Sequence, residues 1–154
     1  MQLVDAALPD KRQVRRSFAR AAEQYDAYAG LQRRTGDWLL KRLDLAKDDA
    51  CLVVDVGSGT GYFLPRLAKR FPAATLVSVD LAEEMLRVGR ARLASGRFVC
   101  SDAEALPLAC ACADLVYSNL VLQWCSSVQR PLAEFARVLQ SGGLGRSVCS
   151  ARQP

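Results

Sequence analysis

The sequence predicts an α/β fold, in which a doubly wound parallel sheet is covered by helices. Short apolar runs alternate with segments whose apolar residues recur at helical spacing. The run at residues 51–55 leads straight into a glycine-rich loop and then into a helical segment. Acidic residues stand where three of the apolar runs end. Because the carboxyl ends of parallel strands meet at one edge of a sheet, these acids are expected to lie close together.

Two helices are predicted before the central strand, over residues 10–28 and 31–43. The first has an apolar side with Val14, Phe18 and Tyr25, opposite a basic side. The basic side consists of Lys11, Arg12, Arg15, Arg16 and Arg20. Such a side is either a solvated surface or a docking surface for an acidic partner. The apolar side of the second helix consists of Leu31, Trp38, Leu39 and Leu43.

Residues 51–63, CLVVDVGSGTGYF, predict a buried strand, a tight loop and the start of a helix. A dinucleotide-binding loop would carry Gly or Ala where Tyr62 stands, and the Gly-Lys-Ser/Thr of a phosphate-binding loop is absent. The carboxylate of Asp55 instead suits a cationic amine, and the helix N-terminus suits a carboxylate group. S-adenosylmethionine carries both groups and has no phosphate. The alternative is a glycine-rich turn without a ligand.

Two further strands are predicted at residues 75–79 and 97–100, each followed by an acid. Asp80 stands where doubly wound folds place a carboxylate on a ribose diol. Asp102 is either a turn residue or an acceptor for an exocyclic amine. Between these strands a helix is predicted over residues 83–93. Met85 in this helix belongs to the core or covers an adenine face.

A fourth strand is predicted at residues 114–118, followed by one more amphipathic helix that ends at residues 141–143. The apolar positions of this helix are Val128, Leu132, Phe135, Ala136 and Leu139.

The composition excludes several classes of catalytic site and of binding partner. The chain has 154 residues, which suits one domain, and contains no histidine, so catalysis by a Ser-His or Cys-His pair is excluded. Cys110 and Cys112 lack zinc-site spacing, and no metal is expected. No secretory signal or membrane-length apolar run is present, so a cytoplasmic location with reduced thiols and no membrane partner is expected. The net charge of +5 is modest, and no nucleic-acid partner is expected.

The chain resembles the class I S-adenosylmethionine-dependent methyltransferases over residues 15–143. The segment VVDVGSGTGYF matches the cofactor loop of that superfamily, LVSVD the ribose acid and CSDAEALPL the adenine edge. Two segments, FARAAEQYDAYAGLQRRTGDWLL and DLVYSNLVLQWC, resemble a narrower group, the malonyl-[acyl-carrier protein] O-methyltransferases of biotin synthesis. A related mitochondrial complex I assembly group shares part of this pattern.

The resemblance implies a Rossmann-like core at residues 46–143, an N-terminal helical lid at residues 1–45, and S-adenosyl-L-methionine as cofactor. The expected cofactor-binding residues are Asp55, Gly57, Ser58, Gly59, Gly61, Asp80, Leu81, Met85, Asp102, Ala103 and Asn119. The expected catalytic residues are Tyr25, Asn119 and Gln123, with Gln32 in the lid and Trp124 either below the methyl group or in the core.

The implied reaction is O-methylation of the free carboxylate of a malonyl-acyl-carrier-protein thioester. An ionised carboxylate needs no base, which agrees with the absence of histidine. The basic N-terminal helix would then face the acidic carrier protein. Two alternatives stay open: a methyltransferase for another small molecule, such as a quinone precursor, or a non-catalytic remnant that binds only cofactor or partner.

The sequence departs from the family after Gly143, where residues 144–154 resemble a tail. Gly145 and Arg146 interrupt the expected buried fifth strand. The complete fold has the strand order 3-2-1-4-5-7-6, so we expect a sheet that lacks the last strands, with the edge of the fourth strand unpaired. The interpretation is a truncated or frame-shifted chain, or a fragment.

Overall fold

The computed structural model describes residues 10–46 and 50–148. Its helices are α1 (Lys11–Ala21), α2 (Tyr25–Tyr28), α3 (Gly30–Leu40), α4 (Leu64–Arg70), α5 (Glu83–Arg92) and α6 (Gln129–Val138), with a short 3-10 turn, η1 (Leu122–Trp124). Its strands are β1 (Leu52–Val56), β2 (Thr75–Asp80), β3 (Arg97–Cys100), β4 (Ala113–Asn119) and β5 (Leu139–Val148). The predicted α/β class is confirmed.

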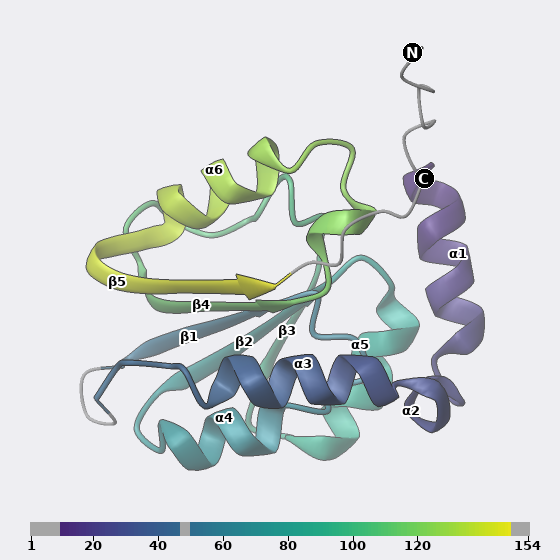
Figure 1. Cartoon of the computed structure of the whole chain (residues 1–154), viewed down its shortest axis with the longest axis horizontal. Helices are drawn as coiled ribbons and strands as arrows, with labels where there is room; N and C mark the ends of the chain where they lie inside the picture. Colours follow the sequence, from purple (N-terminus) through teal and green to yellow (C-terminus); the bar gives the residue numbers. More distant parts are fainter. Residues whose placement is uncertain (1–9, 47–49, 149–154) are drawn as a thin grey trace.

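The five strands form one parallel sheet in the order β3-β2-β1-β4-β5. This order agrees with the first five strands of the predicted topology. Helices α3, α4 and α5 lie on one face of the sheet and α6 lies on the other, while α1 stands at the carboxyl ends of the strands (Figure 1). The sheet order reverses direction between β1 and β4, and parallel sheets of this kind bind ligands outside the carboxyl ends at that point.

The core has two halves because β1 and β4 are buried on both faces. Val53 and Leu115 face α3 and α4, where they pack with Leu39 and Leu67. On the other face, the side chain of Val56 packs in the cluster that includes residues of α6. Uninterrupted apolar runs such as residues 52–54 therefore form the centre of the sheet, as such runs predict.

Strand β5 corrects one prediction. The edge of β4 is not unpaired, because β5 pairs with it in parallel from Leu115↔Leu144 to Asn119↔Val148. Gly145 and Arg146 are exposed, and both are tolerated because β5 is paired on one side only within the described residues. The register shifts ahead of Leu144, where Gly142 adopts a positive φ of 83°. Residues 144–148 of the predicted tail thus lie in the sheet, and residues 149–154 lie outside the described residues.

Three predicted helices differ in detail from the observed ones. The predicted helix at residues 10–28 is divided into α1 and α2 by a turn in which Gln24 N–H donates to Ala21 O at 2.9 Å. In α3, Leu39 is buried but Leu31 and Trp38 are 49% and 50% exposed, so the predicted apolar side is only partly buried. The last helix ends at Val138, and its predicted apolar positions Val128, Leu132 and Ala136 are exposed.

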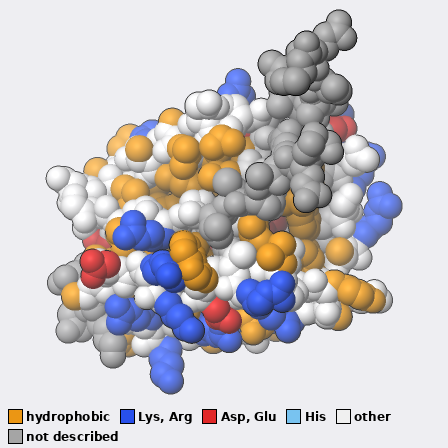
Figure 2. Space-filling view, viewed as in Figure 1, with side chains coloured by type: hydrophobic (Ala, Val, Ile, Leu, Met, Phe, Trp, Pro, Cys, Tyr) orange, Lys and Arg blue, Asp and Glu red, His pale blue; other side chains and the backbone are white. Residues whose placement is uncertain are grey.

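The surface is divided by side-chain type. In the view of Figure 2, hydrophobic side chains gather over α6 and β5, whereas Lys and Arg side chains lie over α3 and α4 and along α1. In the part of the chain that the structure describes, no helix is long and apolar enough to cross a membrane.

Asp55 lies near the end of β1, between Ser78 of β2 and Tyr117 of β4. Its side chain lies on the same face of the sheet as that of Val53, the face that α3 and α4 cover, because alternate residues of a strand point to the same side. The residue is only 4% exposed. Burial, and then the negative charge of Asp80, raise the pKa of the Asp55 carboxyl to about 8.

Replacing Asp55 by Asn should therefore change how stability depends on pH. Between the usual carboxyl pKa and about 8, the folded protein holds a proton on Asp55 that the unfolded chain has released. The wild type should lose stability as the pH rises through this range, by at most about 1.4 kcal/mol per pH unit, relative to Asp55→Asn. Urea unfolding of both proteins at pH 5, 6, 7 and 8 measures this difference. Parallel profiles would contradict the prediction.

Candidate functional site

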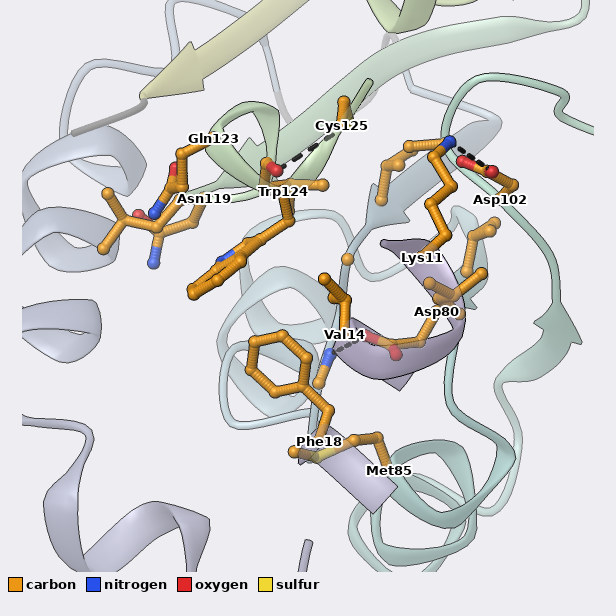
Figure 3. Close-up of a pocket in the computed structure, with 18 of the residues that line it drawn as sticks. Lys11, Val14, Phe18, Asp80, Met85, Asp102, Asn119, Gln123, Trp124 and Cys125 are labelled. Atoms are coloured by element: carbon orange, nitrogen blue, oxygen red, sulfur yellow. Dashed lines mark hydrogen bonds and ion pairs between the residues drawn. The ribbon is translucent and has the colours of Figure 1, made fainter. Parts of the chain in front are cut away.

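A cavity opens at the carboxyl ends of β1, β2, β3 and β4, between the sheet and the inner side of α1. Its wall includes backbone of the glycine loop, the carboxylates of the last residue of β2 and of a residue just after β3, and polar side chains at and after the end of β4. Asp80 and Asp102 lie on one side of the cavity, and Asn119 and Gln123 lie on the other (Figure 3). The residues that close it are Val14, Phe18 and Trp124.

The glycine loop is held against the end of β2. The N–H groups of Gly57 and Ser58 both donate to Val79 O, at 2.7 and 3.0 Å, and Gly59 N–H donates to Asp80 Oδ2 at 2.8 Å. Gly57 has a positive φ of 71°, and a Cβ atom there would lie 2.0 Å from Val121 Cγ2. At Gly59, whose φ is 55°, an added Cβ would meet no atom within 4 Å. Gly59 therefore presents bare backbone to open space in the cavity.

Asp80 ends β2 and faces the cavity with its carboxylate. Besides the Gly59 amide, it accepts a hydrogen bond from Ala82 N–H at 2.9 Å. Burial raises the pKa of Asp80, and these backbone donors act against the rise because they stabilise the charged form. The two amides fix the carboxylate's position, and its lone pairs can accept further hydrogen bonds from a ligand.

Asp102 and Glu104 follow β3 and share a cation that was not expected in the cavity. The ammonium of Lys11, on α1, pairs with Asp102 Oδ2 and lies 2.9 Å from Glu104 Oε1. Burial alone would lower the pKa of Lys11, but its hydrogen bonds to the two carboxylates outweigh burial and raise it. Burial likewise acts to raise the pKa of Glu104, and the bonds from Lys11 and the Ser126 amide lower it. The ion pairs hold α1 over this end of the cavity.

The polar end of the cavity is built by β4 and α3. Asn119 Nδ2 donates to Gln32 O at 2.8 Å, and Asn119 Oδ1 accepts from Thr35 Oγ1 at 2.9 Å. These two bonds fix the orientation of the Asn119 amide. Tyr25 also lines this cavity, where burial and the charge of Asp80 raise the pKa of its hydroxyl. This end therefore offers neutral hydrogen-bonding groups, with no strong base among them.

The apolar part of the cavity is formed by Val14, Leu81, Met85 and Ala103. Phe18 packs edge-on against Trp124, with ring centroids 5.4 Å apart. Met85 is buried against Ala22 and also lines the cavity, so it serves both the core and the site. Trp124 lines the cavity and is half exposed.

The structure brings most of the predicted site residues together. Those that line the cavity are Tyr25, Gly57, Gly59, Asp80, Leu81, Met85, Asp102, Ala103, Asn119 and Gln123. Asp55, Ser58 and Gly61 are not part of its wall as the described residues form it. Asp55 shares the face of β1 with Val53, which packs under α3 and α4. At Gly61, a Cβ would lie 2.7 Å from Leu64 Cδ1 and 3.0 Å from Gly89 Cα, so this glycine permits close helix packing.

Sequence reasoning placed Lys11 on the outward basic side, whereas the structure turns it into the cavity. The helical spacing of Lys11, Val14 and Phe18 was the available signal, because these three residues share one face of α1. Thr35 and Glu104 were also missed, and no local pattern marks either of them. In the described ranges, no three His, Cys, Asp or Glu side chains come close enough together to hold a metal ion.

Comparisons with known proteins agree with this arrangement. The chain is 40% identical to a malonyl-[acyl-carrier protein] O-methyltransferase of Nitrosospira multiformis, over 88% of this chain and 50% of the relative. It is 44% identical to the protein of that name from Laribacter hongkongensis, over 92% and 52%. Among solved structures, a chain from the complex of the Haloferax volcanii Trm112 methyltransferase activator with a methyltransferase superimposes with a TM-score of 0.76. That chain is 25% identical, and the match covers 84% of this chain and 58% of that one.

The chain spans about half the length of the curated relatives it matches. A family model described as "Methyltransferase domain" matches residues 54–145, which include the glycine loop, both cavity carboxylates and β4. The match covers more than half of the sequence. The chain therefore belongs to the methyltransferase domain family.

Proposed function

We propose that the chain is an S-adenosylmethionine-dependent methyltransferase that methylates the free carboxylate of a malonyl thioester on an acyl carrier protein, in the cytoplasm. The cofactor assignment rests on one observation: Asp80, Asp102 and the backbone of Gly59 line the same cavity. The names of the relatives support the acceptor and its place in biotin synthesis.

The cavity suits an adenosyl group with an amino-acid tail. Asp80 can accept from the ribose hydroxyls, and Asp102 can accept from the exocyclic amine of adenine. Leu81, Met85 and Ala103 supply the apolar contacts that a planar ring needs. When bound, the cofactor supplies an electrophilic methyl group on a sulfonium.

The residues at the polar end orient the acceptor. Asn119, Gln123 and Tyr25 can donate hydrogen bonds to a carboxylate and a thioester carbonyl. A carboxylate is already ionised at neutral pH, so this chain's residues have no proton to remove and contribute alignment. Trp124 and Phe18 cover the cavity and exclude water from it. A site without histidine is sufficient for this reaction.

The outer side of α1 suits an acidic carrier protein. Arg12, Arg15, Arg16 and Arg20 are exposed, and none of them forms an ion pair within the described residues. The first three line a shallow hollow that also includes Lys11 and Leu81, both residues of the main cavity. A carrier held on this side would thus be anchored next to the site.

S-adenosylhomocysteine binding, measured by thermal unfolding and calorimetry, tests the cofactor. At a hundred times its dissociation constant, the ligand should stabilise the fold by about 2.7 kcal/mol. Methyl transfer to malonyl-acyl-carrier protein, compared with quinone precursors, then tests the acceptor. An absence of binding contradicts the cofactor assignment. Binding without transfer to any acceptor supports a non-catalytic chain, and transfer only to a quinone precursor replaces the malonyl acceptor.

Gly59→Ala should weaken S-adenosylhomocysteine binding by about tenfold or more, because the added methyl group would stand in the cavity. Gly142→Ala is the matched control: Gly142 also has a positive φ and open space around its Cβ position, but lies in β5. Both variants should lose similar stability, about 1–2 kcal/mol, through backbone strain. Calorimetry and urea unfolding separate the two effects. Equal affinities for the two variants would remove Gly59 from the binding site.

Replacing both Arg15 and Arg16 by Glu should raise the KM for the carrier-bound substrate by about tenfold, with an effect that fades at high salt. The matched control is Lys69→Glu with Arg97→Glu, which changes the net charge equally, at the end of α4 and at the start of β3. A malonyl thioester without a carrier should react equally with both variants. If the two double variants show the same KM for carrier-bound substrate, α1 is not the docking surface.

A further inference from the structure

Asp26 joins three elements around the glycine loop, although it does not line the cavity. Its Oδ1 accepts a hydrogen bond from Thr60 Oγ1 at 2.7 Å, and its Oδ2 forms an ion pair with Arg92 of α5. Its backbone oxygen accepts a hydrogen bond from the guanidinium of Arg33, on α3. One residue of the short helix α2 thus contacts the glycine loop, α5 and α3.

Thr60 makes this contact important, because it stands between Gly59 and Gly61 and is almost fully buried. From the side of the sheet, the loop is held by Val79 O and the Asp80 carboxylate. From the side of the N-terminal helices, it is held by the hydrogen bond of the Thr60 hydroxyl to Asp26 of α2. The loop is therefore anchored both by the sheet and by a helix that precedes β1 in the chain.

The same contacts fix the residues next to Asp26. Tyr25 precedes it and lines the cavity, and Gln32 follows within the next two turns of helix and lines it as well. The guanidinium of Arg33 also lies over the ring of Tyr62, 4.7 Å from its centroid, directly after the glycine loop. The position of α2 and that of the loop are consequently coupled.

We propose that Asp26 is a positioning residue of the cofactor site, which couples the N-terminal helices to the glycine loop. This inference rests on the proposed cofactor function. Asp26 acts through Thr60, whose neighbour Gly59 presents its backbone to the ligand, and through Tyr25, which lines the cavity. Loss of its carboxylate leaves the Thr60 hydroxyl without its acceptor, releases the loop from one of its two anchors and reduces affinity for the cofactor.

Asp37 provides a control for the loss of an ion pair alone, because it also joins two helices through an arginine. Asp37 pairs with Arg66 and ties α3 to α4, as Asp26 ties α2 to α5. Both ion pairs lie at the surface, with carboxylates that are 43% and 26% exposed. Asp37 has no hydrogen bond to the glycine loop in the described structure. The Asp26 side chain binds the glycine loop and the Asp37 side chain does not, so their Ala variants separate coupling from loss of an ion pair.

The experiment measures S-adenosylhomocysteine affinity by calorimetry, well below the unfolding temperature, for Asp26→Ala, Thr60→Val, Thr60→Ser and Asp37→Ala. Asp26→Ala and Thr60→Val should each lose about tenfold in affinity, and their double variant should lose no more than either. Thr60→Ser, which keeps the hydroxyl, and Asp37→Ala should bind as the wild type does. Equal affinity of Asp26→Ala and Asp37→Ala, or additive losses in the double variant, would overturn the proposal.

Hydrogen exchange of the amides at residues 57–61 in the ligand-free protein gives a second measurement. Exchange should be faster in Asp26→Ala than in Asp37→Ala, because only the first change releases the loop. A wild type that fails to bind S-adenosylhomocysteine contradicts the proposed function, and the exchange rates then decide the coupling by themselves. Identical exchange in the two variants overturns the coupling.

Discussion

The constraint on which the site depends is the attachment of the glycine loop to the end of β2. Two amides of the loop share the carbonyl of Val79, and a third binds the Asp80 carboxylate. These bonds require positive φ at Gly57 and Gly59, which residues with side chains adopt only with strain. The loop and the acid are therefore one unit: the same bonds that close the loop also hold the carboxylate in place beside the cavity.

The parallel sheet extends this unit into a complete site. Because all five strands run in one direction, Asp80, Asp102 and Asn119 reach the same edge from three separate strand ends. None of them is close to the others in the sequence. Each of these polar residues stands at or just after the end of an apolar run in the sequence, and the parallel topology brings them together in one cluster. The N-terminal helices then close the cluster, through Lys11 at the acidic end and Tyr25 at the polar end.

The same reasoning explains what could be predicted. The strands and the acids at their ends follow from local patterns, so the sheet order and residues such as Asp80 were within reach of the sequence. Strand β5 was missed because a strand buried on both faces and paired on both sides was expected for Gly145 and Arg146. Within the described residues β5 is paired on one side only, and both residues are exposed. Lys11 and Asp26 were missed for a different reason. Their partners, Asp102 and Thr60, are distant in sequence. The helical spacing of Lys11 with Val14 and Phe18 indicates a shared face of α1, but it does not indicate the partner.

Polar contacts between the N-terminal helices and the sheet edge have a consequence for the proposed chemistry. In the proposed reaction, on an ionised carboxylate, alignment is the protein's main contribution, and alignment depends on how firmly the cavity walls are held. Here the firm wall is the sheet edge, and the helical wall is joined to it by the contacts of Lys11 with Asp102 and of Asp26 with Thr60. Such contacts are individually modest where they are exposed to solvent. Their effect is concentrated in the site because each involves a residue that lines the cavity or directly neighbours one that does.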